Sequence, residues 1–470
     1  MGKFFMKQKS LIQSAAISGI GLHTGKKVNM TIHPAPSNFG VRFRRTDLKC
    51  PNVESLADVS KVVSTNRGTT IQSGEAIVHT VEHILAALYA QGVDNALIDL
   101  DGPEVPIMDG SAAPFIKMIK QAGIQELAAE KEVFTISEPI TFRDEVTGTE
   151  IMALPNDHFE VTVMIDFNSE ILGQQYASLS DLNEFETEIA PCRTFVFLRE
   201  LETLLDLGLI KGGDLDNAIV IADVKVNEGQ LSLLAERLGK KSITIEEEGI
   251  LNTIKLHFKN EAARHKLLDV IGDLALLGKY IQGKIVAKKP GHTSNVSFGK
   301  ILKRKYREFQ KLEVIPKYDP IEPPVLDVTQ INGLLPHRYP FLLIDKVIEI
   351  TEKTVVAIKN VTINEPYFQG HFPGNPVMPG VFQIEAMAQT GGILVLSNVA
   401  NPAEYDTYFL KIDKAKFKHK VVPGDTLIFK LELLSPIRRG ICHMFGSAYV
   451  GDKLVSEGEL TAQIIKRPKK

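Results

Sequence analysis

The sequence predicts an α+β protein of several domains, and three observations lead to this prediction. Strand-like and helix-like segments alternate over the first 305 residues, a proline-rich stretch occupies 306–325, and one long apolar segment among strand-like runs follows. At roughly 150 residues per domain, a chain of 470 residues is expected to form about three domains.

Before residue 305, strands and helices can be placed from their patterns. Three runs are typical of strands: VNMTIHP (28–34), GVRFRR (40–45) and NALIDL (95–100). Three segments carry apolar residues at helical spacing: HTVEHILAALYAQG (79–92), PFIKMIKQAGIQELAAE (114–130) and EAARHKLLDVIGDLALLG (261–278). Glycine ends the first and the last of these helical segments, as it commonly does.

Two boundaries divide the chain. The helical pattern of 114–130 gives way to strand-like KEVFTIS, which places one boundary near residue 130. Residues 306–325 carry four prolines among mixed charges, and proline excludes a regular helix or a central strand. A semi-extended spacer is expected there. We therefore predict domains at 1–130, 131–305 and 326–470, with a linker at 306–325.

After the linker, one apolar segment has the length of a buried helix, VFQIEAMAQTGGILVLS (381–397). Strand-like runs such as DTLIFKLELLS (425–435) and GICHMFGSAYV (440–450) follow it. The simplest interpretation is one buried helix against a curled antiparallel sheet.

The composition is that of a globular protein, with 44% apolar and 24% charged residues. No apolar run approaches the ~20 residues of a membrane-spanning helix, and the N-terminus lacks the apolar stretch of a signal peptide. The three cysteines, Cys50, Cys192 and Cys442, are far apart, which argues against a disulfide framework and a cysteine-bound zinc. We expect a cytoplasmic protein.

Histidine and acidic residues at helical spacing indicate a metal site. His265 and Asp269 lie four residues apart, so one helix face carries both, and both are suitable zinc ligands. A third ligand must come from elsewhere, and His79 and His83 share a face of another helix, so both stay open. The order His79-x-x-Glu82-His83 differs from the protease signature H-E-x-x-H. Ordinary helix surface charge is the alternative for each residue taken alone.

Seven ordered blocks extend along residues 1–305: GIGLHTGKKV (19–28), FRRTD (43–47), TVEH (80–83), PIMDGSAAPF (106–115), CRTF (192–195), RHKLLDVIGD (264–273) and GHTSN (291–295). In them the segment closely resembles the UDP-3-O-acyl-N-acetylglucosamine deacetylases of lipid A synthesis. The resemblance implies two similar α/β sandwich domains with a zinc ion between them. It implies hydrolysis of the N-acetyl group of a UDP-linked glucosamine. Because this substrate carries a 3-hydroxyacyl chain, an apolar passage is expected next to the zinc ion.

The same resemblance implies the residues of the site. His83, His265 and Asp269 would bind the zinc ion, with a water in the fourth position, which decides between the two histidines of the first helix. Glu82 would be the general base that takes the proton of this water and passes it to the leaving amine. Thr194 would donate a hydrogen bond to the oxyanion.

Further residues are assigned around the metal. His292, in the loop PGHTSN, would be the cation beside the oxyanion or the leaving group, and Asp273 would orient it. Lys266 would point away from the ligand beside it and contact the substrate. Phe195 would pack on the substrate, with core packing as an equal alternative, and Glu200 is a further candidate.

The segment GHFPGNPVMPGVFQIEAMAQTGG (370–392) indicates a second site. Its glycines and prolines fix the loop that carries His371, and Gly380 then begins a helix whose first N–H groups are unpaired donors. Glu385 lies inside this apolar helix without a charged neighbour at three or four residues. Burial favours the protonated form of such a carboxyl group, which suits a general acid. A solvent-exposed Glu385 is the alternative.

Four blocks in residues 326–470 resemble the 3-hydroxyacyl-[acyl-carrier-protein] dehydratases of type II fatty acid synthesis: LPHRYPFLLIDKV (335–347), GHFPGNPVMPGV (370–381), EAMAQ (385–389) and KAKFKHKVVPGD (414–425). The resemblance implies a hot-dog fold, a long helix wrapped by an antiparallel sheet, without metal or redox cofactor. His371 would remove the C2 proton, Glu385 would protonate the departing 3-hydroxyl group, and the Gly380 N–H would polarise the thioester carbonyl.

In that family the two residues of one site come from different subunits, so a homo-oligomer is expected, as a dimer or a hexamer. A thioesterase is the rival within the fold, and the intact HFPG…PG…E pattern favours dehydration. The lysine-rich run at 411–420 is a candidate docking surface for an acidic acyl carrier protein, although alternating lysines on a strand usually form a solvated face. No aromatic interleaving or binding motif supports nucleic acid as a partner.

The sequence therefore predicts a bifunctional enzyme, a zinc-dependent amide hydrolase joined to a hydro-lyase. The alternative is an active deacetylase whose hot-dog module serves only for oligomerisation or for regulation by an acyl carrier.

Overall fold

The structure is a computed structural model that describes residues 6–49, 53–201, 217–224, 226, 228–237, 242–246, 249–251, 255–313 and 315–467. Cys50, one of the three cysteines considered above, lies outside these ranges. The chain divides into two compact units, Met1–Arg307 and Glu308–Lys470, which are described separately. In the described ranges no helix is long and apolar enough to cross a membrane.

The first sheet of unit 1 has five strands in the order β2-β3-β9-β4-β5. Their bounds are Ala15–Ile20, Lys27–Pro34, Ala96–Leu100, Val41–Arg45 and Glu54–Leu56. Only β4 and β9 run parallel, and the other neighbours are antiparallel. The three strands that the sequence predicts in this region are confirmed.

A second sheet repeats this arrangement strand for strand. Its main path is β12-β13-β18-β14-β15, and only β14 and β18 run parallel along it. The bounds in this order are Ile140–Asp144, Thr149–Leu154, Tyr280–Lys288, Phe159–Asp166 and Gln174–Leu179. The short strand β11 (Val133–Thr135) adds to β18 in parallel. Both sheets thus place the last strand of the set between the second and the third.

Shorter elements make up the rest of unit 1 within the described ranges. The strands are β1 (Lys7–Leu11) with β10 (Ile124–Glu130), the set β6 (Val62–Ser64), β7 (Thr70–Ser73) and β8 (Ala76–Val78), and the parallel pair β16 (Phe195–Phe197) and β17 (Ile219–Ile221). The helices are η1 (Val59–Lys61), α2 (Ala113–Ala122), η2 (Leu182–Glu184), α3 (Phe185–Glu188) and α5 (Glu228–Arg237).

The helix predicted over 114–130 is wrong in its second half. Helix α2 ends at Ala122, and Gly123 follows with a φ of 69°, a left-handed conformation that glycine adopts at little cost. The chain then continues as strand β10, which pairs with β1 at the start of the sequence. The apolar period alone did not reveal this change, because a glycine inside a helical pattern is compatible with both outcomes.

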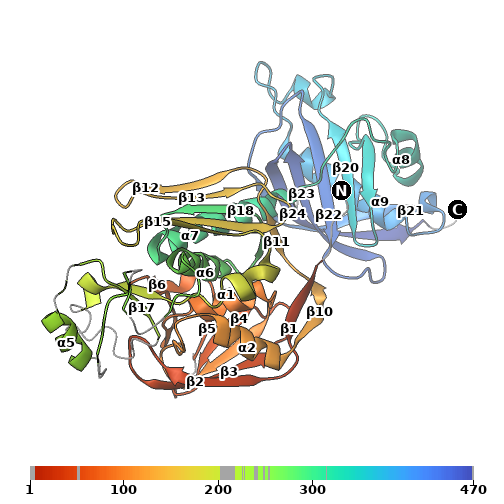
Figure 1. The fold of residues 1–470 in the computed structure, drawn as a ribbon. Helices are drawn as coiled ribbons and strands as arrows, with labels where there is room; N and C mark the ends of the chain where they lie inside the picture. Colours follow the sequence, from red (N-terminus) through yellow and green to blue (C-terminus); the bar gives the residue numbers. More distant parts are fainter. Residues whose placement is uncertain are drawn as a thin grey trace. The chain divides into compact units, whose positions relative to one another are not determined.

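Helices α1 (Glu82–Ala90) and α6 (Glu261–Ala275) contact each other and lie between the two sheets of unit 1 (Figure 1). Helix α1 begins at Glu82 rather than at residue 79, because Thr80 has a φ of 58° and interrupts the helical path. The prediction that His79 and His83 share a helix face is therefore wrong. A long helix, α7 (His292–Glu313), follows β18.

Replacing Gly272 with alanine is expected to push α1 and α6 apart. A Cβ atom on Gly272 would lie 2.1 Å from the backbone oxygen of Glu82, and a backbone atom cannot rotate away. Overpacking of this kind costs about 1–3 kcal/mol of folding free energy. We expect a lower melting temperature, measured by calorimetry, and weaker binding of zinc at the metal site that the sequence predicts, measured by titration. Gly333→Ala, a helical position with open space around it, is the control and should leave both unchanged.

The proposed linker at 306–325 is helical at its beginning, which corrects the prediction. Helix α7 continues to Glu313, because the first proline of the segment, Pro316, comes only after this residue. His292 is likewise the first residue of α7 and not a loop residue.

Unit 2 is one six-stranded antiparallel sheet with a helix packed against it. The strand order is β19-β20-β22-β23-β24-β21. In this order the bounds are Lys346–Ile350, Thr354–Asn360, Thr426–Leu433, Ile441–Val450, Lys453–Lys466 and Tyr405–Phe417. The helices are α8 (Val328–Leu334), α9 (Gly380–Leu396) and the short η3 (Pro366–Gln369) and η4 (Pro402–Glu404).

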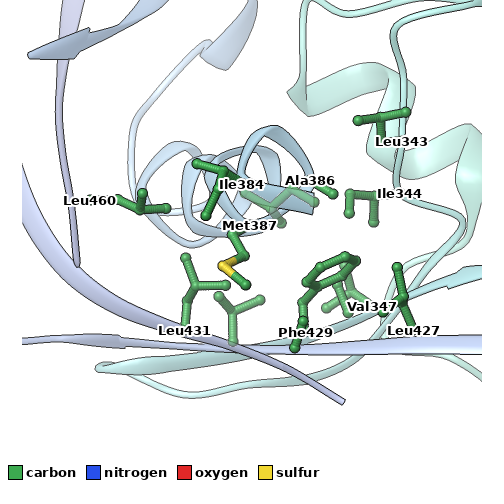
Figure 2. Close-up of a cluster of buried hydrophobic side chains, with 14 of the residues drawn as sticks. Leu343, Ile344, Val347, Ile384, Ala386, Met387, Leu427, Phe429, Leu431 and Leu460 are labelled. Atoms are coloured by element: carbon green, nitrogen blue, oxygen red, sulfur yellow. The ribbon is translucent and has the colours of Figure 1, made fainter. Parts of the chain in front are cut away.

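Helix α9 supplies the core of this unit, as the apolar run at 381–397 predicts. Figure 2 shows Ile384, Ala386 and Met387 of α9 above Phe429 and Leu431 of strand β22. This packing covers one face of the sheet and fixes which side chains of α9 point away from it.

The opposite face of the sheet carries a second apolar cluster, formed by Val356, Ile358, Ile428 and Tyr449. These strand residues alternate with residues of the α9 core, as expected for side chains on opposite faces. Ile315 and Tyr318, from the predicted spacer, pack against this cluster. The segment after α7 is therefore docked on the sheet and not a free spacer.

Candidate active sites

Three potential metal ligands meet where α1 contacts α6. His83 comes from α1, His265 and Asp269 come from one face of α6, and their ligand atoms lie within 4.8 Å of one another. The Nε2 atoms of His265 and His83 lie 3.4 and 3.9 Å from Asp269 Oδ1. All three residues are buried, and this oxygen accepts no hydrogen bond within the part of the chain that the structure describes. A buried carboxylate oxygen facing two imidazoles fits a cation with two nitrogen ligands and one oxygen ligand.

The protonation states around this cluster favour a metal. Burial lowers the pKa of His83 to about 3, and burial also lowers the pKa of His265, so both imidazoles are neutral and able to donate an electron pair. Burial opposes ionisation of Asp269, but Lys266 and the neighbouring histidines outweigh it and lower its pKa. His265 Nδ1 donates to the carbonyl oxygen of Cys192 at 3.0 Å, which directs Nε2 toward Asp269.

His79 lies outside this cluster, whereas Lys266 contacts it. His79 is not part of it, and its Nδ1 lies 3.0 Å from the hydroxyl oxygen of Thr70. Lys266 does not point away from the ligands, because its Nζ donates to Asp269 Oδ2 at 2.8 Å. It also lies 5.6 Å from the centre of the Phe195 ring.

Glu82 precedes His83 at the start of α1 and is 2% exposed. The backbone N–H of Thr69 donates to its Oε2 at 3.0 Å, and His292 Nε2 lies 3.9 Å from its Oε1. Burial is the main cause that raises the pKa of Glu82 to about 7, and the charge of His292 partly opposes this. A carboxyl group with such a pKa exchanges protons readily near neutral pH.

His292 is held by a fully buried carboxylate. Its Nδ1 lies 2.9 Å from Asp273 Oδ2, which also accepts from Asn295 Nδ2 at 2.9 Å. The Thr69 hydroxyl donates to the other oxygen of Asp273 at 2.5 Å. Burial opposes the charged imidazole, but Asp273 and further acidic groups raise the pKa of His292 to about 9. His292 is therefore a cation at neutral pH. The network that fixes it includes Thr69, which no pattern in the sequence indicated.

A cavity of about 240 Å³ adjoins the three ligands. The remaining residues assigned to this site, Thr194, Phe195, Lys266 and Glu200, line it together with Glu82 and His292. Apolar side chains form another part of the wall: Leu22, Ile107, Phe167, Val196, Phe197, Leu201 and Val220. The cavity thus has a polar wall at the cluster and an apolar wall elsewhere, while the passage for an acyl chain stays a prediction.

Two of these lining residues also contact other side chains, and for Phe195 these contacts agree with core packing, the alternative given above. Phe195 lies edge-on to Phe167 and Phe197, so it belongs to a small aromatic core and lines the cavity as well. Glu200 forms an ion pair of 2.8 Å with Arg67, which also lines the cavity. Arg67 was missed because no spacing connects it with the other site residues.

In unit 2, His371 is oriented by its own loop. Its Nδ1 lies 2.7 Å from the carbonyl oxygen of Val377. Since a carbonyl only accepts, Nδ1 carries the proton, and the Nε2 of the neutral ring has its lone pair available as a base.

Glu385 is held on α9 by Gln389, whose Nε2 donates to Oε1 at 2.9 Å. Its side chain is 19% exposed, so it is neither fully buried nor solvated. It lines a cavity of about 190 Å³ that is otherwise mostly apolar, and His371 is not among the lining residues. Within the described part of one chain, His371 therefore does not line the cavity of Glu385.

Gly380 and the lysine-rich run at 411–420 are the remaining predicted features of unit 2. Gly380 is the first residue of α9, and a Cβ atom there would lie 2.7 Å from the ring of Phe417, so glycine is required for this close contact. In the run at 411–420, Lys414, Lys416 and Lys418 form ion pairs with glutamates of β24. Part of the positive charge expected for carrier docking is therefore neutralised.

These features define an enzyme with two separate centres, a metal-ligand cluster beside a base in unit 1 and an imidazole and a carboxyl group in unit 2. Residues 8–241 and 237–304 match the family model for UDP-3-O-acyl N-acetylglycosamine deacetylase, and residues 335–459 match that of the FabA-like domain. Bifunctional enzymes LpxC/FabZ from Bacteroides thetaiotaomicron, Porphyromonas gingivalis and Chlorobaculum tepidum are similar to this chain. They are 51%, 48% and 47% identical over 98% of this chain and 99% of their own length. The chain belongs to this family of bifunctional LpxC/FabZ enzymes, which confirms both resemblances.

Proposed function

We propose that the chain hydrolyses the N-acetyl group of UDP-3-O-(3-hydroxyacyl)-N-acetylglucosamine and dehydrates 3-hydroxyacyl-[acyl-carrier-protein] to the trans-2-enoyl form. The observation that carries the first activity is the meeting of His83, His265 and Asp269 beside Glu82 at the α1–α6 contact. Relatives named for both activities match nearly the whole chain and support the pairing of the two.

For deacetylation, His83, His265 and Asp269 would hold a zinc ion, since two neutral imidazoles and one carboxylate are a usual zinc ligand set. Zinc bound there supplies Lewis acidity and lowers the pKa of a water toward ~7. Glu82 takes the proton of the attacking water and passes it to the amine that leaves. The products are acetate and the free amine of the glucosamine.

The other residues of the cavity would stabilise charge and bind substrate. The imidazolium of His292, fixed by Asp273, lies 3.8 Å from Asp269 and 3.9 Å from Glu82, close to where negative charge develops. Thr194 donates a hydrogen bond to the oxyanion, Lys266 binds a polar part of the substrate, and Phe195 belongs to the apolar passage for the acyl chain.

For dehydration, His371 Nε2 takes the C2 proton of the 3-hydroxyacyl thioester. Glu385 gives its proton to the 3-hydroxyl group, which leaves as water, so one proton is taken up and one is released. The N–H of Gly380, at the start of α9, polarises the thioester carbonyl. No metal or redox cofactor takes part in this proposed step.

We propose that unit 2 has a hot-dog fold and that a second copy of the chain completes each dehydratase site. The absence of His371 from the cavity around Glu385 supports this, because the base must then come from elsewhere. A dimer is the minimum assembly, and a hexamer would be a trimer of dimers. Residues 1–130 and 131–305 would be two similar α/β sandwich domains, which the repeated strand order supports.

The acyl carrier protein as a partner, its docking surface and the cellular location stay proposals. An acyl carrier protein delivers the dehydratase substrate, with the run at 411–420 as its candidate docking surface. The enzyme is proposed to work in the cytoplasm, and nucleic acid is not proposed as a partner.

Chelation should separate the two activities. A strong chelator is expected to abolish acetate release, since the group of potential metal ligands found among the described residues lies in unit 1, and added zinc should restore it. Dehydration of a 3-hydroxyacyl thioester by the same sample should not change. Both rates are measured on one preparation of the whole chain, with an untreated sample as the control.

Either deviation would be informative. Loss of dehydration on chelation would contradict the proposed chemistry of His371 and Glu385 or show that the metal maintains the assembly. A chain that never dehydrates the thioester would favour the alternative, in which unit 2 only oligomerises or binds a carrier.

A further inference from the structure

A loop of unit 2 is fastened to α9 next to Glu385. This loop, residues 335–343, connects α8 with the start of the sheet. Gln389 of α9 donates from Nε2 to the carbonyl oxygen of Phe341 at 2.8 Å and accepts the N–H of Leu343 on Oε1, also at 2.8 Å. Arg338 closes the other end by donating to the carbonyl oxygen of Leu335 at 2.8 Å. The loop therefore has a fixed position relative to Glu385.

This loop places a second imidazole beside the proposed acid. His337 Nε2 lies 3.6 Å from Glu385 Oε1, and both side chains line the cavity of about 190 Å³. The ring of His337 is stacked on Phe341, with centroids 6.1 Å apart and planes inclined by 25°. The distance is slightly longer than a hydrogen bond, and catalytic contacts of this kind commonly shorten when substrate binds.

The protonation of His337 suits a donor to a carboxylate. Burial lowers the pKa of His337, Glu385 acts against this shift, and Arg338 adds to it, so the ring is neutral at neutral pH. Its Nδ1 is buried and has no hydrogen-bond partner among the residues that the structure describes. A proton on Nε2 therefore satisfies the ring better, because it points toward an acceptor.

Glu385 needs such a donor because its role ends with a negative charge in an apolar cavity. Gln389 already donates to Oε1, and a second donor on that oxygen would leave Oε2 to carry the proton that is transferred. We propose that His337 is a positioning residue of the dehydratase: its Nε2–H fixes Oε1 of Glu385 and stabilises the carboxylate that remains after proton transfer. His337 keeps its own proton, so the balance given above does not change. This inference rests on the proposed dehydration.

The test compares three replacements of His337 in the whole chain. Phenylalanine keeps the ring against Phe341 but has no donor, glutamine places an amide N–H about as far out as Nε2, and asparagine reaches only as far as Nδ1. We expect kcat for dehydration to fall roughly 10- to 100-fold for His337→Phe and His337→Asn, with KM changed less than about twofold. His337→Gln should recover most of the loss. Acetate release by the same samples is the control and should not change.

The pH profile distinguishes positioning from a merely structural role. Glu385 and Arg338 are the charged groups beside His337. A donor favours the ionised carboxyl group, so its loss should move the alkaline limb of the kcat–pH profile to higher pH, by on the order of half a unit. A structural defect would lower kcat at every pH and leave the limb in place.

Three results would overturn the inference. One is wild-type kcat for both His337→Phe and His337→Asn, and another is a His337→Gln variant as impaired as His337→Asn. In both, dehydration by the unaltered chain would stand. If the unaltered chain shows no dehydration, the proposed function of unit 2 fails and this inference fails with it.

Discussion

Replacing Asp269 with alanine is expected to lower the rate of acetate release by roughly 10³-fold or more and to remove the zinc ion that we propose for this site from the purified protein. Asp269 is the only carboxylate of the ligand cluster, so its loss leaves two neutral nitrogens for a divalent cation. It would also leave the ammonium group of Lys266 close to the vacated position, which repels a cation. Zinc content by atomic emission and acetate release by a coupled assay measure the two effects.

The matched control is His79→Gln. His79 lies near the cluster in sequence but contacts Thr70 instead of the ligands, so zinc content and acetate release should stay close to those of the unaltered chain. Loss of zinc from this variant, with zinc retained on replacement of His83, would mean that the wrong histidine was assigned. Dehydration should be normal in every one of these variants.

Two inactive dehydratase variants are expected to restore each other when mixed. His371→Ala and Glu385→Ala should each abolish dehydration, because one lacks the base and the other the acid. If each site combines residues of two chains, a dimer of the two variants has one intact site and one site that lacks both groups, so dimers that contain both variants regain about half of the sites. The measurement is thioester dehydration after the two variants are produced together with different affinity tags and purified over both.

Purification over both tags ensures that every assembly in the assay contains both variants, so a missing activity cannot result from chains that did not mix. Mixed assemblies without dehydration would contradict a shared site and would require His371 and Glu385 of one chain to meet. Acetate release by the mixture should equal that of the unaltered chain, because neither replacement touches unit 1.

The sequence predicted the parts of the sites that lie close together along the chain. His265 and Asp269 followed from helical spacing, and the structure places both on one face of α6. The choice of His83 over His79 came only from family resemblance. Residue spacing could not decide between the two histidines. The left-handed backbone at Thr80 removes His79 from the helix, and an apolar pattern does not reveal such a backbone conformation.

Residues brought in from distant segments could not be predicted. Thr69 and Arg67 reach the first site from a loop before β7, and His337 reaches the second from the loop after α8. Such contacts depend on tertiary packing, which has no period in the sequence. The matching strand orders of the two sheets in unit 1 were invisible for the same reason, since a strand order can recur without any shared residues.

The docking of Ile315 and Tyr318 determines where the chain can be cut without harm. A dehydratase fragment that begins at residue 326 would lack both side chains and would expose Val356, Ile358 and Ile428 to water. A contiguous apolar surface on a sheet favours aggregation. Solubility of an isolated dehydratase therefore depends on including the segment from residue 315 onward. A protease that cleaves among the later prolines would leave Ile315 and Tyr318 linked to unit 1 and no longer to the sheet that they cover.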